Sequence, residues 1–550
     1  LTLNADGSYT YVADKANALA LGATADDVFT YTVSDGKGGF DTAELRIAVT
    51  GTNDAPVAAN DAGAVAEDAT LTVSAANGVI ASASNPAGTD TDVDGGPLAI
   101  SAIRTGLEAG SGTAGTVGSA LSGTYGTLTL NSDGSYTYVA DKANALALGA
   151  TADDVFTYTV SDGKGGFDTA ELRIAVTGTN DAPVAANDSG AVAEDATLTV
   201  SAANGVIASG SNPAGTDTDV DGGPLAVSAI RTGLETGSGT AGTVGSALAG
   251  TYGTLTLNSD GSYTYVADKA NALALGATAD DVFTYTVSDG KGGFDTAELR
   301  IAVTGTNDAP VAANDSGSVA EDATLTVSAA NGVIASASTP AGTDTDVDGG
   351  PLAVSAIRTG LETGSGTAGT VGTALAGTYG TLTLNADGSY TYVADKANAL
   401  AAGATADDVF TYTVSDGKGG FDTAELRIAV TGTNDAPVAA NDSGAVAEDA
   451  TLVVSAANGV IASGSNPAGT DTDVDGGPLA VSAIRTGLET GSGSAGTVGT
   501  ALAGTYGTLT LNADGSYTYV ADKANALAAG ATADDVFTYT VSDGKGGFDT

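Results

Sequence analysis

A period of 127 residues runs through the whole chain. The segment LTLNxDGSYTY begins at Leu1, Leu128, Leu255, Leu382 and Leu509. The copies are almost identical, since residues 128–254 and 255–381 differ at only four positions. Repetition at this spacing predicts an array of separately folding modules rather than one large domain. One good copy is enough for an active site, so near-identical copies favour a structural fibre that needs length, valency or stiffness.

The period also sets the expected module boundaries. We predict a partial module at 1–53, complete modules at 54–180, 181–307 and 308–434, and a module at 435–550 that stops before its last strand. The chain then begins and ends inside a module, so we expect it to be a window from a longer array whose targeting signals lie elsewhere. No apolar run is long enough to span a bilayer, so no membrane insertion is expected.

The charge is strongly acidic. The chain has 66 acidic and 18 basic residues, a net charge of −48. In module 54–180, 15 acidic residues stand against four basic ones. This sign disfavours nucleic acid and anionic membranes as partners and favours divalent cations. The simpler interpretation is an acidic surface that only keeps a secreted protein soluble.

Cysteine, histidine, methionine and tryptophan are all absent. Without cysteine there is no disulfide or thiolate site, and without histidine the commonest general base and transition-metal ligand is missing. Hard cations bound by oxygen are the metal chemistry that remains. Paired carboxylates can hydrolyse glycosides, but the aromatic platform is missing and the pair would be copied four times. We therefore expect no enzyme.

Short Thr-, Val- and Tyr-rich segments with alternating apolar and polar residues predict antiparallel β-structure. In module 54–180 we expect one hairpin joining 127–131 to 135–139 and another joining 155–161 to 168–178. Asp154 is expected to anchor the corner before its strand, and Asp162 to shape the second hairpin turn. Further strands are expected within 64–73, 78–82 and 97–106, with one helical turn at 143–149. Seven or more strands in about 130 residues predict an all-β, immunoglobulin-like sandwich.

The sharpest local motif is Asp90-Thr-Asp92-Val-Asp94-Gly95-Gly96. It returns at Asp217–Asp221, Asp344–Asp348 and Asp471–Asp475. Carboxylates at alternate positions followed by glycine match the opening of a calcium loop, and three crowded carboxylates repel unless a cation neutralises them. The twelfth position is Ser101 rather than glutamate, so this is no EF-hand, and Glu67 and Asp68 are plausible additional donors. The alternative is an acidic Asp-Gly turn between strands.

The joint between modules is the second candidate site. The last strand of one module should end near Val176, and Pro183 fixes an extended entry into the next. The sequence here is similar to the joints between cadherin domains, although one residue shorter. In those joints an Asn-Asp-x-Ala-Pro-like linker, a glutamate-bearing strand start and an Asp-x-Asp motif share calcium ions. The resemblance implies a joint set of Asn180, Asp181, Glu194, Asp195, Asp217 and Asp219. The alternative is a solvated acidic linker.

The calcium prediction covers every copy of both motifs. The expected ligands are Asn53, Asp54, Glu67, Asp68, Asp90, Asp92, Asp94, Asn180, Asp181, Glu194, Asp195, Asp217, Asp219, Asp221, Asn307, Asp308, Glu321, Asp322, Asp344, Asp346, Asp348, Asn434, Asp435, Glu448, Asp449, Asp471, Asp473 and Asp475.

Several motifs return in the same order in the modules. They are TGTNDAPV at 177–184, EDATL at 194–198, DVDGG at 219–223, GTLTLNxDGSYTY at 253–265 and FTYTVSDG at 283–290. With these motifs the modules resemble, over their full length, the VCBS repeats of bacterial surface proteins. The resemblance implies a cadherin- or immunoglobulin-like sandwich in a very large secreted protein. Such proteins are often exported by type I secretion and associated with adhesion and biofilm. It supplies no binding target, because the ligand-binding domain often lies outside the repeats.

Two classes of function follow. The leading hypothesis is the shaft of an extracellular bacterial adhesin or surface filament, stiffened by calcium at the joints and acidic loops. Lateral or end-to-end assembly of chains is a variant of it, and a glycan or host surface would be met by domains outside this chain. The alternative is a multivalent array in which each module holds a carbohydrate or host protein weakly. Exposure of Tyr125, Tyr136 or Tyr138 would favour that alternative.

Overall fold

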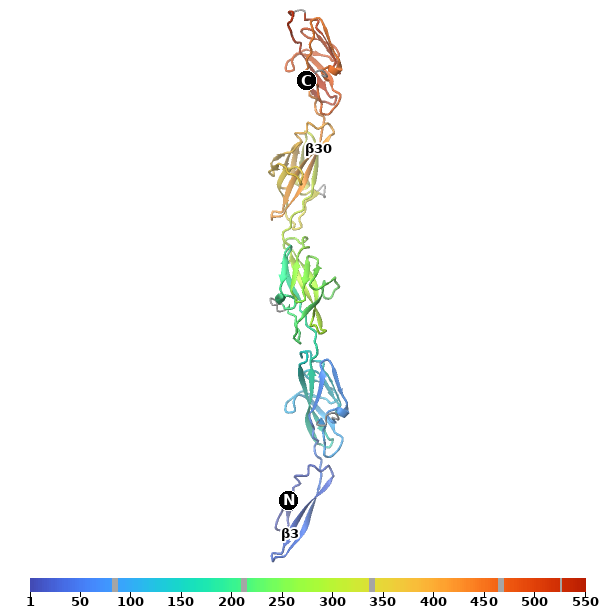
Figure 1. Cartoon of the computed structure of the whole chain (residues 1–550), viewed down its shortest axis with the longest axis vertical. Helices are drawn as coiled ribbons and strands as arrows, with labels where there is room; N and C mark the ends of the chain where they lie inside the picture. Colours follow the sequence, from blue (N-terminus) through green and yellow to red (C-terminus); the bar gives the residue numbers. More distant parts are fainter. Residues whose placement is uncertain (82–87, 209–214, 336–341, 463–468, 525–526) are drawn as a thin grey trace. The chain divides into compact units, whose positions relative to one another are not determined.

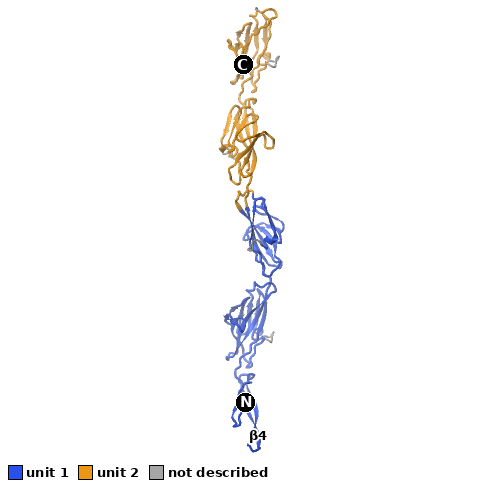
Figure 2. Cartoon of the chain, turned by 90° about the vertical axis from the view of Figure 1, so that its left-hand side faces the viewer, with its two compact units in different colours: residues 1–270, 279–303 blue, residues 271–278, 304–550 orange. Residues whose placement is uncertain are grey.

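The computed structural model describes residues 1–81, 88–208, 215–335, 342–462, 469–524 and 527–550. They form two compact units, residues 1–270 with 279–303 and residues 271–278 with 304–550 (Figure 2). The described secondary structure consists of strands and short 3₁₀ turns. Within these ranges, no helix has the length and apolar character needed to cross a membrane.

The repeat 54–180 folds into two sheets that face each other across one core (Figure 1). The five-stranded sheet has the order β5-β13-β12-β7-β8, and the four-stranded sheet the order β6-β11-β10-β9. The first comprises β5 (Asp61–Ala66), β13 (Phe167–Thr177), β12 (Thr151–Ser161), β7 (Ala99–Thr105) and β8 (Ala114–Gly115). The second comprises β6 (Thr70–Val73), β11 (Tyr136–Val139), β10 (Thr127–Leu130) and β9 (Ala120–Ser122), and the 3₁₀ turn η1 spans Ala75–Asn77.

The same elements return in the next two repeats. The second contains β14 (Asp188–Ala193), β15 (Thr197–Val200), η3 (Ala202–Asn204), β16 (Ala226–Thr232), β17 (Ala241–Gly242), β18 (Ala247–Ala249), β19 (Thr254–Leu257), β20 (Tyr263–Val266), β21 (Thr278–Ser288) and β22 (Phe294–Thr304). The third contains β23 (Asp315–Ala320), β24 (Thr324–Val327), η5 (Ala329–Asn331), β25 (Ala353–Thr359), β26 (Ala368–Gly369), β27 (Ala374–Ala376), β28 (Thr381–Leu384), β29 (Tyr390–Val393), β30 (Thr405–Ser415) and β31 (Phe421–Thr431).

The two ends of the chain carry fewer strands. Residues 1–53 contain β1 (Thr2–Leu3), β2 (Tyr9–Thr10), β3 (Thr24–Ser34) and β4 (Phe40–Thr50). The last repeat contains β32 (Thr451–Val454), η7 (Ala456–Asn458), β33 (Ala480–Thr486), β34 (Ala495–Gly496), β35 (Ala501–Ala503), β36 (Thr508–Leu511), β37 (Tyr517–Val520), β38 (Phe537–Ser542) and β39 (Phe548–Asp549).

Alternation along the strands builds the core. Leu128 and Leu130 of β10, with Tyr136 and Tyr138 of β11, point inward, while the threonines between them are partly exposed. The facing sheet contributes Phe156, Tyr158 and Val160 from β12 and Leu172, Ile174 and Val176 from β13. Every second residue of a strand faces the same side, so these sequences can bury only one face of each sheet.

Both predicted hairpins are confirmed. Strand β10 pairs with β11 from Thr127↔Val139 to Leu130↔Tyr136, and β12 pairs with β13 along eleven residues. The predicted segment 97–106 contains β7. The segment 64–73 is interrupted by a turn in which Asp68 adopts a positive φ of 58°. Strand β5 before that turn runs parallel to β13, a long-range pairing that the hairpin pattern does not indicate.

Two predictions about secondary structure were wrong. Residues 78–81 form no strand, and Ser82 lies outside the described residues. Val79 instead donates its N–H to Gly134 O at 3.0 Å and is buried as part of the core. Residues 143–149 form turns rather than a helical turn, because Gly149 donates to Gly178 O at 2.9 Å and the loop is held against the end of the repeat.

Candidate metal centre

The four-residue linker 178–181 is hydrogen-bonded to the repeats on both of its sides. Gly178 donates its N–H to Ala150 O at 2.8 Å, and a Cβ at Gly178 would lie 2.4 Å from Ala147 O, so no larger residue fits. Thr179 donates its N–H to Glu67 Oε1 of the repeat that ends here, at 2.8 Å. Two residues later, Asp181 donates its N–H to Asp221 Oδ2 of the repeat that begins here, at 2.9 Å.

Acidic side chains from both repeats therefore meet at the linker. Thr179 and Asp181 are about 7 Å apart at most, so their partners Glu67 and Asp221 lie near the same point. The pKa of Asp181 is raised, first by burial and then by the nearby charges of Glu67, Asp221, Asp68 and Asp219. Like charges this close destabilise the ionised state of each carboxyl unless a cation is present.

Four oxygen atoms of this joint have no hydrogen-bond donor among the described residues. They are Glu67 Oε2, Asn180 Oδ1, Asp181 Oδ2 and Asp219 Oδ2, and each is buried. A buried oxygen without a donor or a cation costs free energy. Carboxylate and amide oxygens in this number are the donors that calcium takes, so the residues fit that ion.

The oxygen atoms that could bind a metal lie near the linker but are not gathered at one point. Among the described residues, no group of three or more acidic or other metal-ligating side chains is gathered closely enough to hold a metal ion. An ion at the joint would have to draw these oxygens together.

The joint at 432–435 shows the same arrangement. Thr433 donates its N–H to Glu321 Oε2 at 2.9 Å, and Asp435 donates its N–H to Asp475 Oδ2 at 2.8 Å. The pKa values of Glu321 and Asp435 are raised, mainly by burial. The buried oxygens without a donor in the described structure are Glu321 Oε1, Asp435 Oδ2 and Asp473 Oδ2. At the joint 51–54 they are Asn53 Oδ1 and Asp92 Oδ2.

The predicted grouping of Asn180 and Asp181 with Glu194 and Asp195 is wrong. Asp195 donates its N–H to Ala267 O at 2.9 Å. Ala267 belongs to the same repeat and directly follows β20. The glutamate at this joint is Glu67. Because β5 runs parallel to β13, its carboxyl end lies beside the end of the last strand, where Glu67 donates its N–H to Thr177 O at 2.9 Å.

The predicted single calcium loop at Asp90–Asp94 is divided between two places. Asp94 accepts hydrogen bonds from the N–H groups of Asp54 at 2.7 Å and Leu21 at 2.5 Å, at the preceding joint. Asp90 is buried inside its own sandwich, where Ala59 N–H donates to its Oδ1 at 2.8 Å and burial raises its pKa to about 7. Gly95, at a φ of 59°, closes the turn after Asp94 by donating its N–H to Asp92 O at 3.2 Å. Glu67 joins neither place, because it accepts from Thr179 N–H at the following joint.

Asp154 and Asp162 have the structural roles predicted for them. Asp154 accepts from the N–H groups of Thr124, Tyr125 and Gly126 at 2.8, 3.0 and 3.1 Å, and from Tyr138 Oη at 2.6 Å. Asp162 accepts from the N–H groups of Lys164 and Gly166 in the hairpin turn. A hydrogen bond from the Asn53 side chain at 2.6 Å, followed by these backbone donors, lowers the pKa of Asp162.

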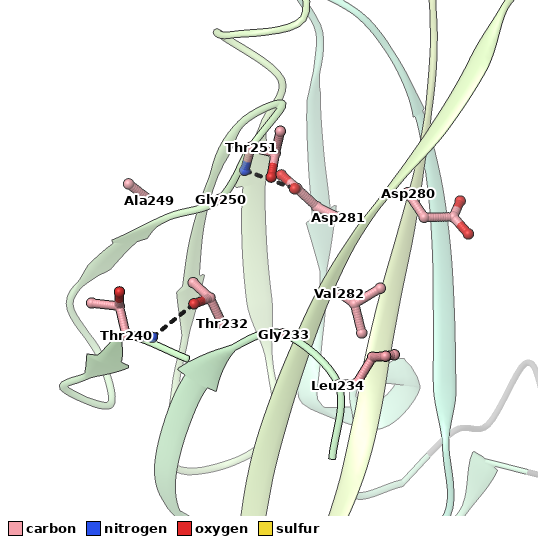
Figure 3. A pocket seen from close by; sticks show the side chains of 10 residues that line it. All are labelled: Thr232, Gly233, Leu234, Thr240, Ala249, Gly250, Thr251, Asp280, Asp281 and Val282. Carbon is pink, nitrogen blue, oxygen red and sulfur yellow. Dashed lines mark hydrogen bonds between the residues drawn. The ribbon is translucent and has the colours of Figure 1, made fainter. Parts of the chain in front are cut away.

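A pocket lies beside Asp281, the counterpart of Asp154 in the second repeat. In the second repeat it is lined by Thr232, Gly233, Leu234, Thr240, Ala249, Gly250, Thr251, Asp280, Asp281 and Val282 (Figure 3). Asp281 points to Thr251 N at 2.7 Å and is fully engaged, like Asp154. The Asp280 side chain points away from Asp281, and no aromatic side chain is among the described residues that line the pocket.

Comparison with known proteins identifies the repeats. Residues 53–178, 180–305, 307–432 and 434–550 match the bacterial cadherin-like domain, and residues 1–48 match a bacterial Ig domain. A comparison with curated proteins gave no match. The family consists of structural, non-catalytic domains typical of surface or secreted proteins, and acidic residues at its joints are compatible with calcium.

Similar solved structures are ectodomains of animal cadherins. The protocadherin gamma B4 extracellular domain has a TM-score of 0.42 at 14% identity, covering 99% of this chain and 73% of that chain. Mouse cadherin-23 EC22–24 has a TM-score of 0.35 at 12% identity, covering 69% and 100%. Drosophila N-cadherin EC1–4 has a TM-score of 0.25 at 10% identity, covering 89% and 96%. All three TM-scores lie below 0.5, so the assignment rests on the sequence match. The chain belongs to the bacterial cadherin-like domain family, as an all-β tandem array of sandwich repeats.

Proposed function

We propose that this array is the structural shaft of an extracellular bacterial adhesin or surface filament, and that its joints bind calcium. The observation that carries the proposal is the set of buried oxygens without donors at the linker: Glu67 Oε2, Asn180 Oδ1, Asp181 Oδ2 and Asp219 Oδ2. Glu67 belongs to the repeat before the linker, Asn180 and Asp181 to the linker, and Asp219 to the repeat after it. An ion shared by all three would therefore restrain the joint itself.

Each part of the chain has a separate role in this proposal. Glu67 and Asp181 bring carboxylate oxygens, while Asn180 brings an amide oxygen that adds a metal ligand without adding charge. Bound calcium would add positive charge among these acidic side chains. Because the oxygens are assembled only in the folded chain, calcium stabilises the folded state by mass action, by about 2.7 kcal/mol at a hundredfold excess over Kd. A chain exported unfolded would then fold where calcium is abundant.

The alternative of a multivalent binding array lacks the observation that would favour it. Tyr136 is 4% exposed and Tyr138 is fully buried, both in the core. Tyr125 is partly buried and packs against that core. The pocket in Figure 3 has no aromatic surface on which a sugar could stack. We therefore retain the structural shaft as the proposed function.

Small-angle X-ray scattering of the full chain tests the proposal, with millimolar calcium and again with excess chelator. We expect a stiffer, more extended particle with calcium. The changes Asp92→Asn, Asp219→Asn, Asp346→Asn and Asp473→Asn together should remove this response. A control with Asp153→Asn, Asp280→Asn, Asp407→Asn and Asp534→Asn removes the same charge away from the joints and should keep it. Scattering that does not respond to chelator would sink the proposal.

A further inference from the structure

Each repeat contains a second cluster of buried oxygens, inside the sandwich and separate from the joint. Its centre is Asp90, which is only 6% exposed. Ala59 N–H donates to Asp90 Oδ1 at 2.8 Å, but Asp90 Oδ2 is buried with no hydrogen-bond partner among the described residues. Asp61, 8% exposed, and the fully buried Tyr158 lie beside it.

The Tyr158 hydroxyl lies near more hydrogen-bond acceptors than it can donate to. Its Oη lies 2.7 Å from Ala59 O, 2.9 Å from Asp61 Oδ2 and 3.3 Å from Val79 O. A tyrosine hydroxyl carries one hydrogen, so it donates one full hydrogen bond. The other contacts bring oxygen lone pairs together in a buried space. Asp90 Oδ2 adds a buried lone pair with no donor among the described residues, and a cation would stabilise it.

No basic side chain of the repeat supplies that charge within the described structure. Arg104 donates to Leu107 O and Glu108 O, and Arg173 pairs with Glu171. The remaining two bases are also placed elsewhere, Lys142 at the Ser122 hydroxyl and Lys164 beside Gly96. The charges that act on Asp90 are those of Asp61 and Asp168, both acidic.

The cluster is repeated along the chain. Asp217 and Asp344 are each 6% exposed, and their Oδ2 atoms also have no partner among the described residues. Tyr285 Oη lies 2.9 Å from Asp188 Oδ2 and 3.5 Å from Asp217 Oδ1. In the last repeat Tyr539 Oη lies 3.1 Å from Asp471 Oδ1 and 3.4 Å from its Oδ2. The Oδ2 atom without a partner among the described residues therefore recurs in the three complete repeats.

We propose that each sandwich binds a hard, oxygen-seeking cation of the calcium class between Asp61 and Asp90. Two carboxylates would balance a divalent charge, and Val79 O offers a neutral oxygen of the kind calcium accepts. Tyr158 could then give its single hydrogen to Ala59 O. This site lies within one repeat and uses neither the linker nor Asp92 and Asp94, so it does not depend on the joint proposed above.

Counting bound calcium by equilibrium dialysis tests the site on the full chain. The variant with Asp90→Asn, Asp217→Asn and Asp344→Asn should lose one ion for each changed repeat, three in all. The variant with Asp92→Asn, Asp219→Asn and Asp346→Asn is the matched control, because it should lose ions at the joints and keep those inside the sandwiches. The two variants therefore distinguish loss of calcium at the joints from loss of calcium at this site.

Asparagine also mimics a protonated aspartate. If a shared proton or a water molecule occupies the cluster, the Asp90-type variant will bind as many ions as the unchanged chain, which overturns the proposal. Anomalous diffraction from crystals of the unchanged chain soaked in terbium gives a second measurement that needs no variant. We expect a peak between Asp61 and Asp90, and terbium luminescence that Tyr158→Phe diminishes. A map without that peak would also overturn it.

Discussion

At the scale of single residues, Asp154 organises one edge of the sandwich through a single carboxylate. It receives four hydrogen bonds, from the N–H groups of Thr124, Tyr125 and Gly126 and from the Tyr138 hydroxyl. The change Asp154→Asn replaces one accepting oxygen by a donor. We expect the free energy of unfolding of that repeat to fall by roughly 2–4 kcal/mol, because buried donors lose their acceptor. Urea unfolding of the full chain measures this as a separate, earlier transition.

Asp153 provides the control for this prediction. It is adjacent in sequence, exposed, and forms only a long ion pair of 3.9 Å with Arg173. Asp153→Asn makes the same chemical change and should alter the free energy of unfolding by no more than about 0.5 kcal/mol. Equal effects of the two substitutions would show that charge, not the hydrogen-bond network, is what matters.

Glu171, with its equivalents Glu298 and Glu425, should make the repeats sensitive to acid. The N–H of Glu108 donates to Glu171 Oε1 at 2.9 Å and, with Arg173, lowers the pKa of Glu171 below its ordinary 4.5. A carboxyl with a lowered pKa stabilises the fold above its unfolded pKa and loses that contribution as the pH falls. We expect stability to decline as the pH drops below 4.5, and Glu→Gln at all three positions to flatten that decline in urea titrations. An unchanged slope would contradict this.

At the scale of elements, the first strand of each repeat depends on a partner far along the chain. The sequence DSGAVA forms β14 at 188–193 beside β22, yet the same six residues at 442–447 form no strand. The residues that pair with this strand in the repeat 54–180, residues 172–177, have no counterpart among residues 435–550. In a polypeptide made of residues 1–550, hydrogen exchange should therefore be at least about tenfold slower at 188–193 than at 442–447. Adding the segment AELRIAVTG after Thr550 should slow exchange at 442–447, and equal exchange in both chains would contradict this account.

The same element shows how far the sequence could be read. Alternating residues around Asp-Gly turns were enough to predict the hairpins of β10 with β11 and β12 with β13, because those partners are close in sequence. The parallel pairing of β5 with β13 joins residues 111 apart, such as Asp61 and Leu172, and leaves no local pattern. The prediction therefore expected a glutamate at the linker 178–181 but named Glu194, whereas the structure places Glu67 there.

At the scale of the whole molecule, nearly identical repeats give every linker the same acidic sequence. Each complete repeat carries far more acid than base, and several of those acids lie at the linkers. The total repulsion in the array therefore increases with each added joint unless cations neutralise it. An array of this composition is consistent with a chain that works where calcium is abundant, and the joints are where its mechanical properties would be set.

The joints also contain a contact that needs no ion. Asp221 accepts from Leu148 N–H of the preceding repeat at 2.6 Å through Oδ1, and from Asp181 N–H of the linker at 2.9 Å through Oδ2. Asp94 makes the corresponding contacts with Leu21 and Asp54. Both oxygens of Asp221 thus restrain the joint directly, whereas Asp219 has a buried oxygen without a donor.

These two aspartates should consequently be separable by experiment. Spin labels placed in the repeats 54–180 and 181–307 report the distribution of distances across the joint. With chelator present, we expect Asp219→Ala to leave this distribution unchanged and Asp221→Ala to broaden it, because only Asp221 holds the preceding loop without an ion. With calcium present, both changes should broaden it. If neither substitution broadens the distribution in chelator, Asp221 has no restraining role of its own and the stiffness of the joint depends on calcium alone.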